Sequence, residues 1–208
     1  MAKEGLTEIV CIIDKSGSMD LIKEDAIGGF NAFLKEQREL PGDALVTLVL
    51  FDTVYNVLTN GIPIEKVAPL DERTYRPGGM TALLDAVGIT LDRVSRRIEE
   101  TPIAAKPEKV IVAILTDGLE NSSVEYTGKQ ILTKIQHKQQ VDNWEFVYLG
   151  ANQDAIKEAA ALGIKKTHAM NFAGTSEGVK ESYDKLSYAV QSYREQGFVD
   201  EEWKNKGN

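Results

Sequence analysis

Three short segments of the sequence concentrate oxygen-bearing side chains of types that suit a hard divalent cation. Residues 14–19 read Asp-Lys-Ser-Gly-Ser-Met, residues 78–86 read Gly-Gly-Met-Thr-Ala-Leu-Leu-Asp-Ala, and residues 116–121 read Thr-Asp-Gly-Leu-Glu-Asn. Carboxylates and neutral oxygens are the ligands that magnesium, manganese and calcium prefer. The predicted ligands of such an ion are Asp14, Ser16, Ser18, Thr81 and Asp117.

The spacing Asp-x-Ser-x-Ser lets one loop turn alternate oxygen side chains inward, and Gly17 permits the backbone to bend tightly between them. Two carboxylates, from Asp14 and Asp117, balance the charge of a divalent ion, whereas hydroxyls are weak neutral ligands. Magnesium prefers an octahedral oxygen shell and commonly retains water in it. We therefore expect an electrophilic ion with an open position, at which an incoming carboxylate could bind directly.

The elements that must position these side chains alternate between strands and helices. Apolar runs predict strands at 8–13, 44–51, 54–58, 109–115, 144–149 and 168–172, and helical spacing predicts helices at 21–39, 84–98, 131–135, 153–162 and 176–196. Such alternation indicates a three-layer α/β/α doubly wound fold, with a mostly parallel sheet and one antiparallel edge strand. Ligands of these sheets bind beyond the carboxyl ends of the strands, which is where the three polar segments fall.

Composition restricts the classes of partner. The chain has 208 residues and a formal net charge of −8, which disfavours nucleic acid and anionic lipid and favours a cation. The lone Cys11 lies in an apolar run, where an inert buried thiol is expected. Neither a signal-peptide core nor a membrane-length apolar run is found, so we expect a cytoplasmic protein without membrane insertion. We expect one domain over 1–197 and a charged, frayed tail over 198–208.

The combination Asp14-x-Ser16-x-Ser18, Thr81 after Gly-Gly, and Asp117 in Leu-Thr-Asp-Gly resembles the metal-ion-dependent adhesion site of von Willebrand factor A (vWA) domains. The run Gly-Gly-Met-Thr-Ala-Leu-Leu-Asp-Ala is similar to that of bacterial and phage members. The resemblance covers residues 7–170 and implies the Rossmann-like vWA fold. It also implies that the five residues hold Mg, or Mn or Ca, and that the ion captures an Asp or Glu side chain of a protein partner.

Other side chains near these motifs have less specific interpretations. Asp14 and Ser16 could merely cap the next helix, and the Asp117-Gly118 pair alone is typical of a turn. Asp52 could lie near the site but more readily forms a hairpin turn. The candidates for a rim that contacts the partner are Lys15, Met19, Met80, Glu120 and Asn121. Lys15 could equally be an ordinary surface lysine, and Glu120 and Asn121 could belong to a solvated loop without a role in binding.

Two other functions compete with metal-dependent binding. A magnesium-dependent phosphoryl-transfer hydrolase of the haloacid-dehalogenase type would use Asp14 as its nucleophile, but it needs a second Asp at the position of Ser16. The chain also has no Gly-x-Ser-x-Gly elbow and no phosphate loop of the Gly-x-x-x-x-Gly-Lys type. The other rival is a structural assembly subunit with a vestigial metal site. We expect a binding protein that is not an enzyme.

Overall fold

A six-stranded sheet forms the centre of the computed structural model, which describes residues 2–151 and 154–206. The order across the sheet is β3-β2-β1-β4-β5-β6, and neighbouring strands are parallel except β2 and β3. The predicted mostly parallel sheet with one antiparallel edge strand is therefore confirmed. The strands are β1 (Lys3–Asp14), β2 (Ala44–Phe51), β3 (Tyr55–Pro63), β4 (Pro107–Thr116), β5 (Glu145–Ala151) and β6 (Ala169–Phe172).

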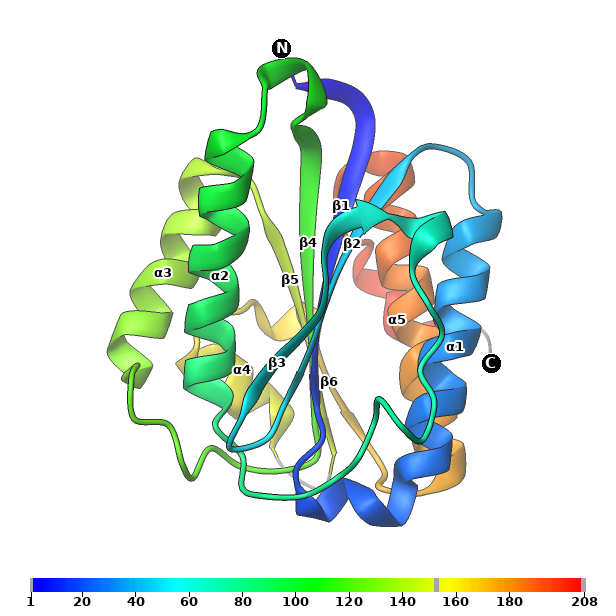
Figure 1. Ribbon diagram of the computed structural model, residues 1–208, viewed down its shortest axis with the longest axis vertical. Coiled ribbons are helices and arrows are strands. Elements are labelled where there is room, and N and C mark those ends of the chain that lie inside the picture. Colours follow the sequence, from blue (N-terminus) through cyan, green and yellow to red (C-terminus); the bar gives the residue numbers. More distant parts are fainter. Residues whose placement is uncertain (1, 152–153, 207–208) are drawn as a thin grey trace.

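Helices cover both faces of this sheet and complete the three predicted layers (Figure 1). On one face lie α1 (Lys23–Glu39) and α5 (Ser176–Gln196), and on the other lie α2 (Leu83–Glu100), α3 (Gly128–Val141) and α4 (Ala155–Ala161). No helix in the described part of the chain combines the length and apolar character that a bilayer crossing requires.

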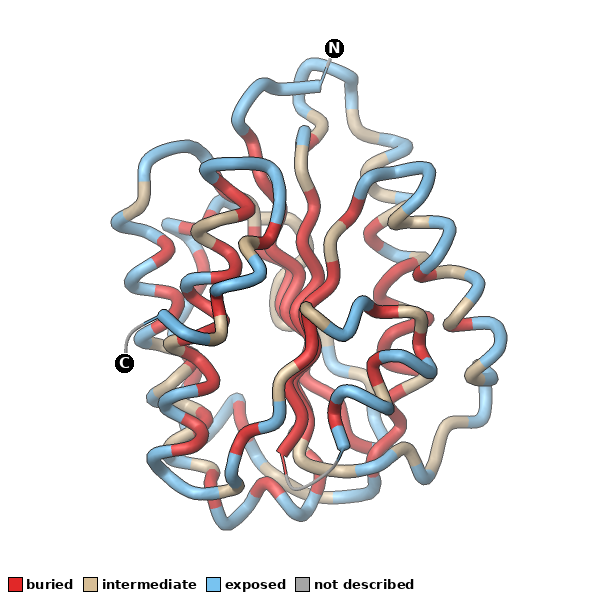
Figure 2. Tube along the Cα trace, turned by 180° about the vertical axis from the view of Figure 1, so that it is seen from behind, coloured by how far each residue is buried: buried red, intermediate tan, exposed pale blue. Residues whose placement is uncertain are grey.

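The two cores follow from the alternation of side chains along the strands. In β1, Ile9, Cys11 and Ile13 pack on the side of α1 and α5, whereas Val10 and Ile12 pack on the side of α2 and α3. All five residues are buried, because a central parallel strand is covered on both faces. Figure 2 shows this as a buried centre flanked by helices along which buried and exposed residues alternate.

The topology creates a switch point between β1 and β4. From β1 the chain passes through α1 to β2 and β3, and then returns through α2 to β4 on the other side of β1. The connections after β1 and β4 therefore diverge to opposite faces of the sheet, which opens a crevice at the carboxyl ends of these two strands. Asp14 is the last residue of β1, and Asp117 directly follows β4.

Within the described residues 198–206, the chain packs against the domain, which differs from the frayed tail expected from the charged sequence. Residues 207–208 of that expected tail lie outside the described residues. Residues Glu201–Asn205 form a short 3-10 helix, and the Trp203 side chain is fully buried in the core beside α5. The indole Nε1 of Trp203 donates a hydrogen bond to the Thr167 carbonyl at 3.0 Å. Trp203, together with the buried Val199, thus attaches a segment whose other side chains are mostly charged.

Candidate functional site

Three loops meet at the carboxyl ends of β1 and β4, at the lower end of the molecule in Figure 1. The first follows β1 and continues into a 3-10 helix, η1 (Gly17–Ile22). The second leads into α2, and the third follows β4. A hydrogen bond from the Gly17 N–H to the Gly79 carbonyl, at 3.2 Å, joins the first two loops. The sequence motifs that lie far apart along the chain are therefore neighbours in space.

A chain of short polar contacts connects four of the five predicted ligands. The Ser16 N–H donates to Asp14 Oδ1 at 2.6 Å, and the Ser16 and Ser18 hydroxyl oxygens lie 3.2 Å apart. The Ser18 hydroxyl in turn donates to Asp117 Oδ1 at 2.7 Å. The carboxylate that ends β1 and the carboxylate that follows β4 are thus bridged by the two serines.

Thr81, the fifth predicted ligand, is buried and lies against the loop after β4. A Cβ atom on Gly118 would be only 2.8 Å from the Thr81 hydroxyl oxygen, so a side chain at position 118 would have to displace it. The Thr81 N–H donates to Asn121 Oδ1 at 2.9 Å, and the Asn121 N–H donates to the Thr81 carbonyl at 3.1 Å. Gly118 and Asn121 therefore hold Thr81 against the loop after β4, with its hydroxyl beside Gly118, the residue that follows Asp117.

A positive-φ glycine forms the turn before Thr81. Gly79 has φ of +67°, a left-handed conformation that glycine adopts without strain. A Cβ atom at this position would also lie 2.8 Å from the Thr53 hydroxyl, which accepts a hydrogen bond from the Met80 N–H at 2.9 Å. Both the conformation and the space therefore require glycine before Met80 and Thr81.

The electrostatics of the site leave negative charge uncompensated by protein cations. Burial raises the pKa of Asp14 to about 6, although hydrogen bonds from Thr116 and Ser16 act in the opposite direction and Asp117 raises it further. Burial also raises the pKa of Asp117. Among the described residues, no Lys or Arg forms an ion pair with either carboxylate. Two buried or half-buried carboxylates without a cationic partner are unfavourable unless a cation is supplied.

The donor set fits a hard ion better than a soft one. In the described ranges, no group of three or more His, Cys, Asp and Glu side chains is arranged to hold a metal, so a nitrogen- or sulfur-rich site is not formed there. The candidate site instead combines two carboxylates with three hydroxyls, which are oxygen ligands suited to Mg, Mn or Ca. Polar contacts connect Asp14, Ser16, Ser18 and Asp117, and Thr81 lies against the loop that contains Asp117. The role of these five residues in metal binding stays a prediction.

Helix capping does not account for the first motif. Ser16 is the N-cap residue of η1, yet its side chain makes no capping hydrogen bond. The residue that precedes α1 is Ile22, which has no polar side chain. Asp14 accepts instead from the Ser16 N–H and, through Oδ2, from the Thr116 hydroxyl at 2.6 Å. The side chains of Asp14 and Ser16 are therefore directed to the cluster and not to a helix end.

Two residues of the predicted rim need correction. Met19 is fully buried in the core under α1, because η1 turns its side chain inward, so it cannot contact a partner. The Lys15 ammonium forms an ion pair with Asp52, and both side chains are nearly buried. Asp52 also shapes the hairpin turn, since its Oδ1 accepts from the Val54 N–H at 2.6 Å. Lys15 therefore secures the β2–β3 turn and does not present a free charge to a partner.

Of the three remaining predicted rim residues, Met80 is an exposed apolar residue, whereas Glu120 and Asn121 hold the loops together through hydrogen bonds. The Glu120 carboxylate accepts from the N–H groups of Leu84, Ser122 and Ser123, so it holds the loop after β4 against the start of α2. Asn121 holds Thr81 in the same way, as described above. Whether these residues also touch a partner stays a prediction.

Tyr75 is a part of the site that the sequence did not indicate. Its side chain is fully buried, and its hydroxyl donates to the Asp14 carbonyl at 2.6 Å. Burial raises the pKa of Tyr75, with smaller contributions from Tyr183, Asp14 and Asp117, so the phenol remains a donor. Tyr75 lies in the irregular connection between β3 and α2, where no periodicity signals which side chains turn inward. The hydrogen bond fixes the backbone at the end of β1.

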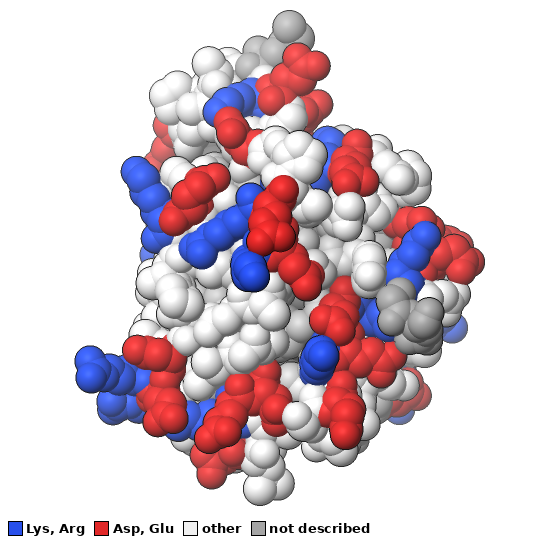
Figure 3. All heavy atoms as spheres, turned by 90° about the vertical axis from the view of Figure 1, so that its right-hand side faces the viewer, with Lys and Arg blue, Asp and Glu red and all other residues white. Residues whose placement is uncertain are grey.

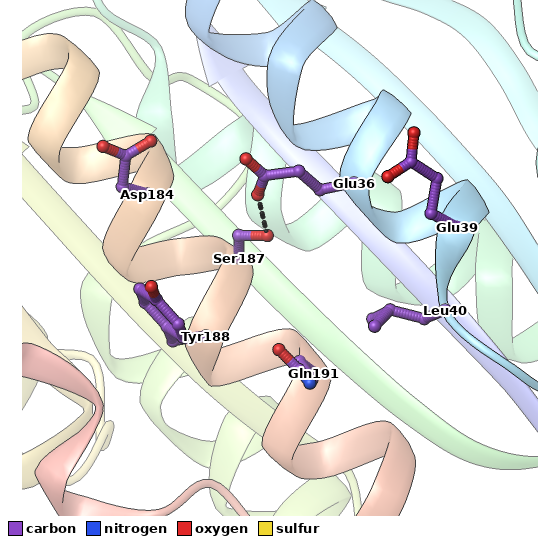
Figure 4. Close-up of a pocket in the computed structure, with 7 residues that line it drawn as sticks. All are labelled: Glu36, Glu39, Leu40, Asp184, Ser187, Tyr188 and Gln191. Atoms are coloured by element: carbon purple, nitrogen blue, oxygen red, sulfur yellow. Dashed lines mark hydrogen bonds between the residues drawn. The ribbon is translucent and has the colours of Figure 1, made fainter. Parts of the chain in front are cut away.

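A separate groove of about 360 Å³ lies between α1 and α5, away from the predicted ligands (Figure 4). In it, the Ser187 hydroxyl donates to Glu36, and Asp184 and Glu39 add further acidic groups. Figure 3 shows Asp and Glu side chains spread over this side of the molecule, with Lys and Arg among them. None of the predicted metal ligands lines the groove, so we assign it no part in the candidate site.

Comparisons with known proteins identify the fold. No protein-family model matches the sequence, and no curated protein matches it. Among solved structures, the fold is similar to that of proximal thread matrix protein 1 from the mussel byssus, in a structure with a zinc-occupied MIDAS motif. The TM-score is 0.63 and the identity 16%, and the match covers 91% of this chain and 48% of that one. The von Willebrand factor type A protein from Catenulispora acidiphila is similar with a TM-score of 0.58 and 16% identity, over 92% and 43%.

A third structure matches over almost its whole length. The vWF domain of the type V pili tip protein Mfa5 from Porphyromonas gingivalis has a TM-score of 0.60 and 10% identity, over 93% of this chain and 98% of that one. By contrast, this chain spans less than half of the two proteins named before it. At these identities the likeness shows the fold alone, which is that of von Willebrand factor A domains.

Proposed function

We propose that this protein is a divalent-metal-dependent protein-binding module, which captures an Asp or Glu carboxylate of a partner through a bound Mg ion. The observation that carries the proposal is the pair Asp14 and Asp117, whose carboxylates are desolvated, bridged by serine hydroxyls and without a cationic partner among the described residues. A divalent ion would supply the missing positive charge to this cluster.

The chemistry of the donors supports an ion that remains available to a partner. Asp14 and Asp117 would provide the anionic ligands, and Ser16, Ser18 and Thr81 the neutral ones. Ser18 is exposed whereas Asp14 and Ser16 are buried, so the cluster reaches from the interior to the surface. Because hydroxyls donate little charge, the bound ion would act as an electrophile toward an incoming carboxylate. Mn or Ca could replace Mg at such a set of oxygen ligands.

The structural neighbours also support a metal-dependent binding function. One of them has a zinc-occupied MIDAS motif, and their names describe a thread matrix protein and a pilus tip protein. For the phosphoryl-transfer alternative, Ser16 stands where a second carboxylate would be needed, and its hydroxyl lies beside Ser18. We therefore propose binding without chemical conversion of the partner. Turnover of phosphate esters that depends on both magnesium and Asp14 would contradict this part.

Calorimetric titration with Mg²⁺ and Mn²⁺ tests the metal site. We expect one site per chain in the wild type and loss of binding in Asp14→Asn and Asp117→Asn, which keep the side-chain shape but remove one charge each. Asp20→Ala is the matched control, because Asp20 is an exposed carboxylate in the same segment with no role in the cluster. Wild-type protein that binds neither ion at millimolar concentration, or Asp14→Asn that binds as the wild type does, would overturn the proposal.

A further inference from the structure

Large apolar side chains are exposed on the loops around the candidate metal site. Among the described residues, half of the large hydrophobic side chains that are exposed belong to the loops at the carboxyl ends of the strands. Each of them is more than half exposed, although the burial of an apolar side chain away from water is energetically favourable. These residues are Leu21, Val54, Met80, Leu119 and Val124.

Contacts on the backbone place most of these residues close to the predicted ligands. Met80 and Leu119 are neighbours in sequence of Thr81 and Gly118, which approach each other closely. The Met80 N–H donates to the Thr53 hydroxyl, which puts Val54 next to this pair. Thr53 also lines a small pocket together with Val124. Leu21 lies in η1, three residues after Ser18. We refer to Leu21, Val54, Met80, Leu119 and Val124 as the apolar rim.

The loops that carry the apolar rim provide few positive charges for a second acidic group of a partner. Over residues 14–22, 52–54, 78–82 and 117–124, Lys15 is the one basic residue, and its ammonium is paired with Asp52. Lys23 and Arg76 lie just outside these ranges: Lys23 begins α1 beside the acidic Glu24 and Asp25, and Arg76 precedes the Gly-Gly turn. With a divalent ion bound, the positive charge of this surface would therefore be concentrated at the ion. Within these loop segments, a second acidic group on the partner would meet the apolar rim and no unpaired cation.

From this arrangement we infer that the partner's carboxylate is flanked by apolar side chains and is not part of an acidic stretch, an inference that rests on the proposed function. The apolar rim would bury the flanking side chains and exclude water from the ion. Exclusion of water strengthens the electrostatic attraction between ion and carboxylate, because the local dielectric constant falls. The ion would then provide recognition of charge, and the rim would provide selectivity for the surroundings of that charge.

Three small carboxylates test the inference on the intact, Mn²⁺-loaded protein. Acetate presents the charge alone, hexanoate adds an apolar chain, and adipate adds a second carboxylate at the end of a similar chain. Broadening of their proton NMR signals by bound Mn²⁺ gives the three affinities. We expect hexanoate to bind at least about tenfold more tightly than acetate, since each buried methylene contributes to affinity. Adipate should bind more weakly than hexanoate.

Variants show whether the rim causes the preference. The double variant Met80→Ser with Leu119→Ser should bring hexanoate affinity to within about threefold of acetate affinity, because it removes two apolar surfaces beside the ion. Ile103→Ser is the matched control: Ile103 is equally exposed, but it lies before β4, at the other end of the sheet. This control should keep the wild-type ratio of affinities. Calorimetry with Mn²⁺ confirms for each variant that the ion still binds.

The outcomes separate this inference from the proposed function. Mn²⁺ binding with equal affinities for acetate and hexanoate, or with adipate bound most tightly, would overturn the inference and leave the metal site intact. An unchanged hexanoate preference in the double variant would also overturn it, because the rim would then not be its source. Absence of Mn²⁺ binding to the wild type would overturn both the inference and the proposed function.

Discussion

Thr81 and Asn121 hold each other by two hydrogen bonds in opposite directions. The Thr81 N–H donates to Asn121 Oδ1 at 2.9 Å, and the Asn121 N–H donates to the Thr81 carbonyl at 3.1 Å. This pair joins the loop after β4 to the loop before α2. Because Thr81 and Asp117 belong to these two loops, the pair also sets the distance between two of the predicted ligands.

We predict that Asn121→Ala weakens Mn²⁺ binding about tenfold, as is common when a residue that orients a metal ligand is lost. Asn121→Asp keeps an oxygen acceptor for the Thr81 N–H and should retain most of the affinity. Calorimetry measures both variants, and urea unfolding of the metal-free proteins shows whether the fold is maintained. Wild-type affinity in Asn121→Ala would show that Thr81 needs no such support.

Gly29 in α1 provides a test of the packing between α1 and α5. A Cβ atom at this position would lie 2.2 Å from Cδ2 of Tyr183, which is buried in α5. We predict that Gly29→Ala lowers the free energy of unfolding by about 1–3 kcal/mol, because Tyr183 must leave its position. The measurement is urea unfolding at equilibrium.

Gly28→Ala is the matched control for this substitution. A Cβ atom on Gly28 would meet no other atom within 4 Å, and both glycines belong to the same helix. The free energy of unfolding should therefore rise by about 0.4–1 kcal/mol in Gly28→Ala, since alanine restricts the unfolded chain more than glycine does. Equal effects of the two substitutions would contradict the close contact between Gly29 and Tyr183.

The C-terminal segment should contribute to stability through Trp203. This side chain is fully buried, and its indole hydrogen bond to Thr167 joins it to the segment before β6. We predict that Trp203→Ala lowers the free energy of unfolding by about 3–5 kcal/mol. Phe198→Ala should change it by less than about 0.5 kcal/mol, because Phe198 is more than half exposed. A small effect of Trp203→Ala would indicate that the segment is frayed after all.

Cys11 should be inert toward thiol reagents in the native protein. Burial raises the pKa of its thiol to about 12, and the side chain is almost inaccessible in the middle of β1. A raised pKa leaves very little thiolate even at about pH 8.5, where an exposed cysteine is half ionised. We predict slow reaction with a disulfide reagent under native conditions and one fast equivalent in urea. Fast labelling of the native protein would contradict the burial of Cys11.

The sequence predicts those parts of the fold that a periodic pattern encodes. The strands at 109–115 and 144–149 were recognisable because they lie inside the sheet and are apolar along their length, and they correspond to β4 and β5. Asp14 and Asp117 could be placed at strand ends for the same reason. In open α/β sheets such ends meet in space, so the neighbourhood of the candidate ligands followed from topology.

Residues whose orientation depends on a distant neighbour could not be predicted in this way. Lys15 pairs with Asp52, which lies in a different loop, so its sequence position next to a candidate ligand was misleading. Met19 turns inward because a 3-10 helix precedes α1, and Tyr75 turns inward from a connection without periodicity. The burial of Trp203 could not be predicted, because most of its neighbours in the sequence are charged. For Lys15, Tyr75 and Trp203 the deciding contact joins residues far apart along the chain.

The most direct test of the central claim is the relaxation of water protons by Mn²⁺. An ion held by Asp14, Asp117 and the three hydroxyls, with an open position, should relax bulk water more strongly when bound than when free. Added acetate should then lower this enhancement, because a carboxylate replaces water on the ion. Absence of any enhancement in the wild type, or an enhancement that acetate leaves unchanged, would contradict metal-dependent capture of a carboxylate.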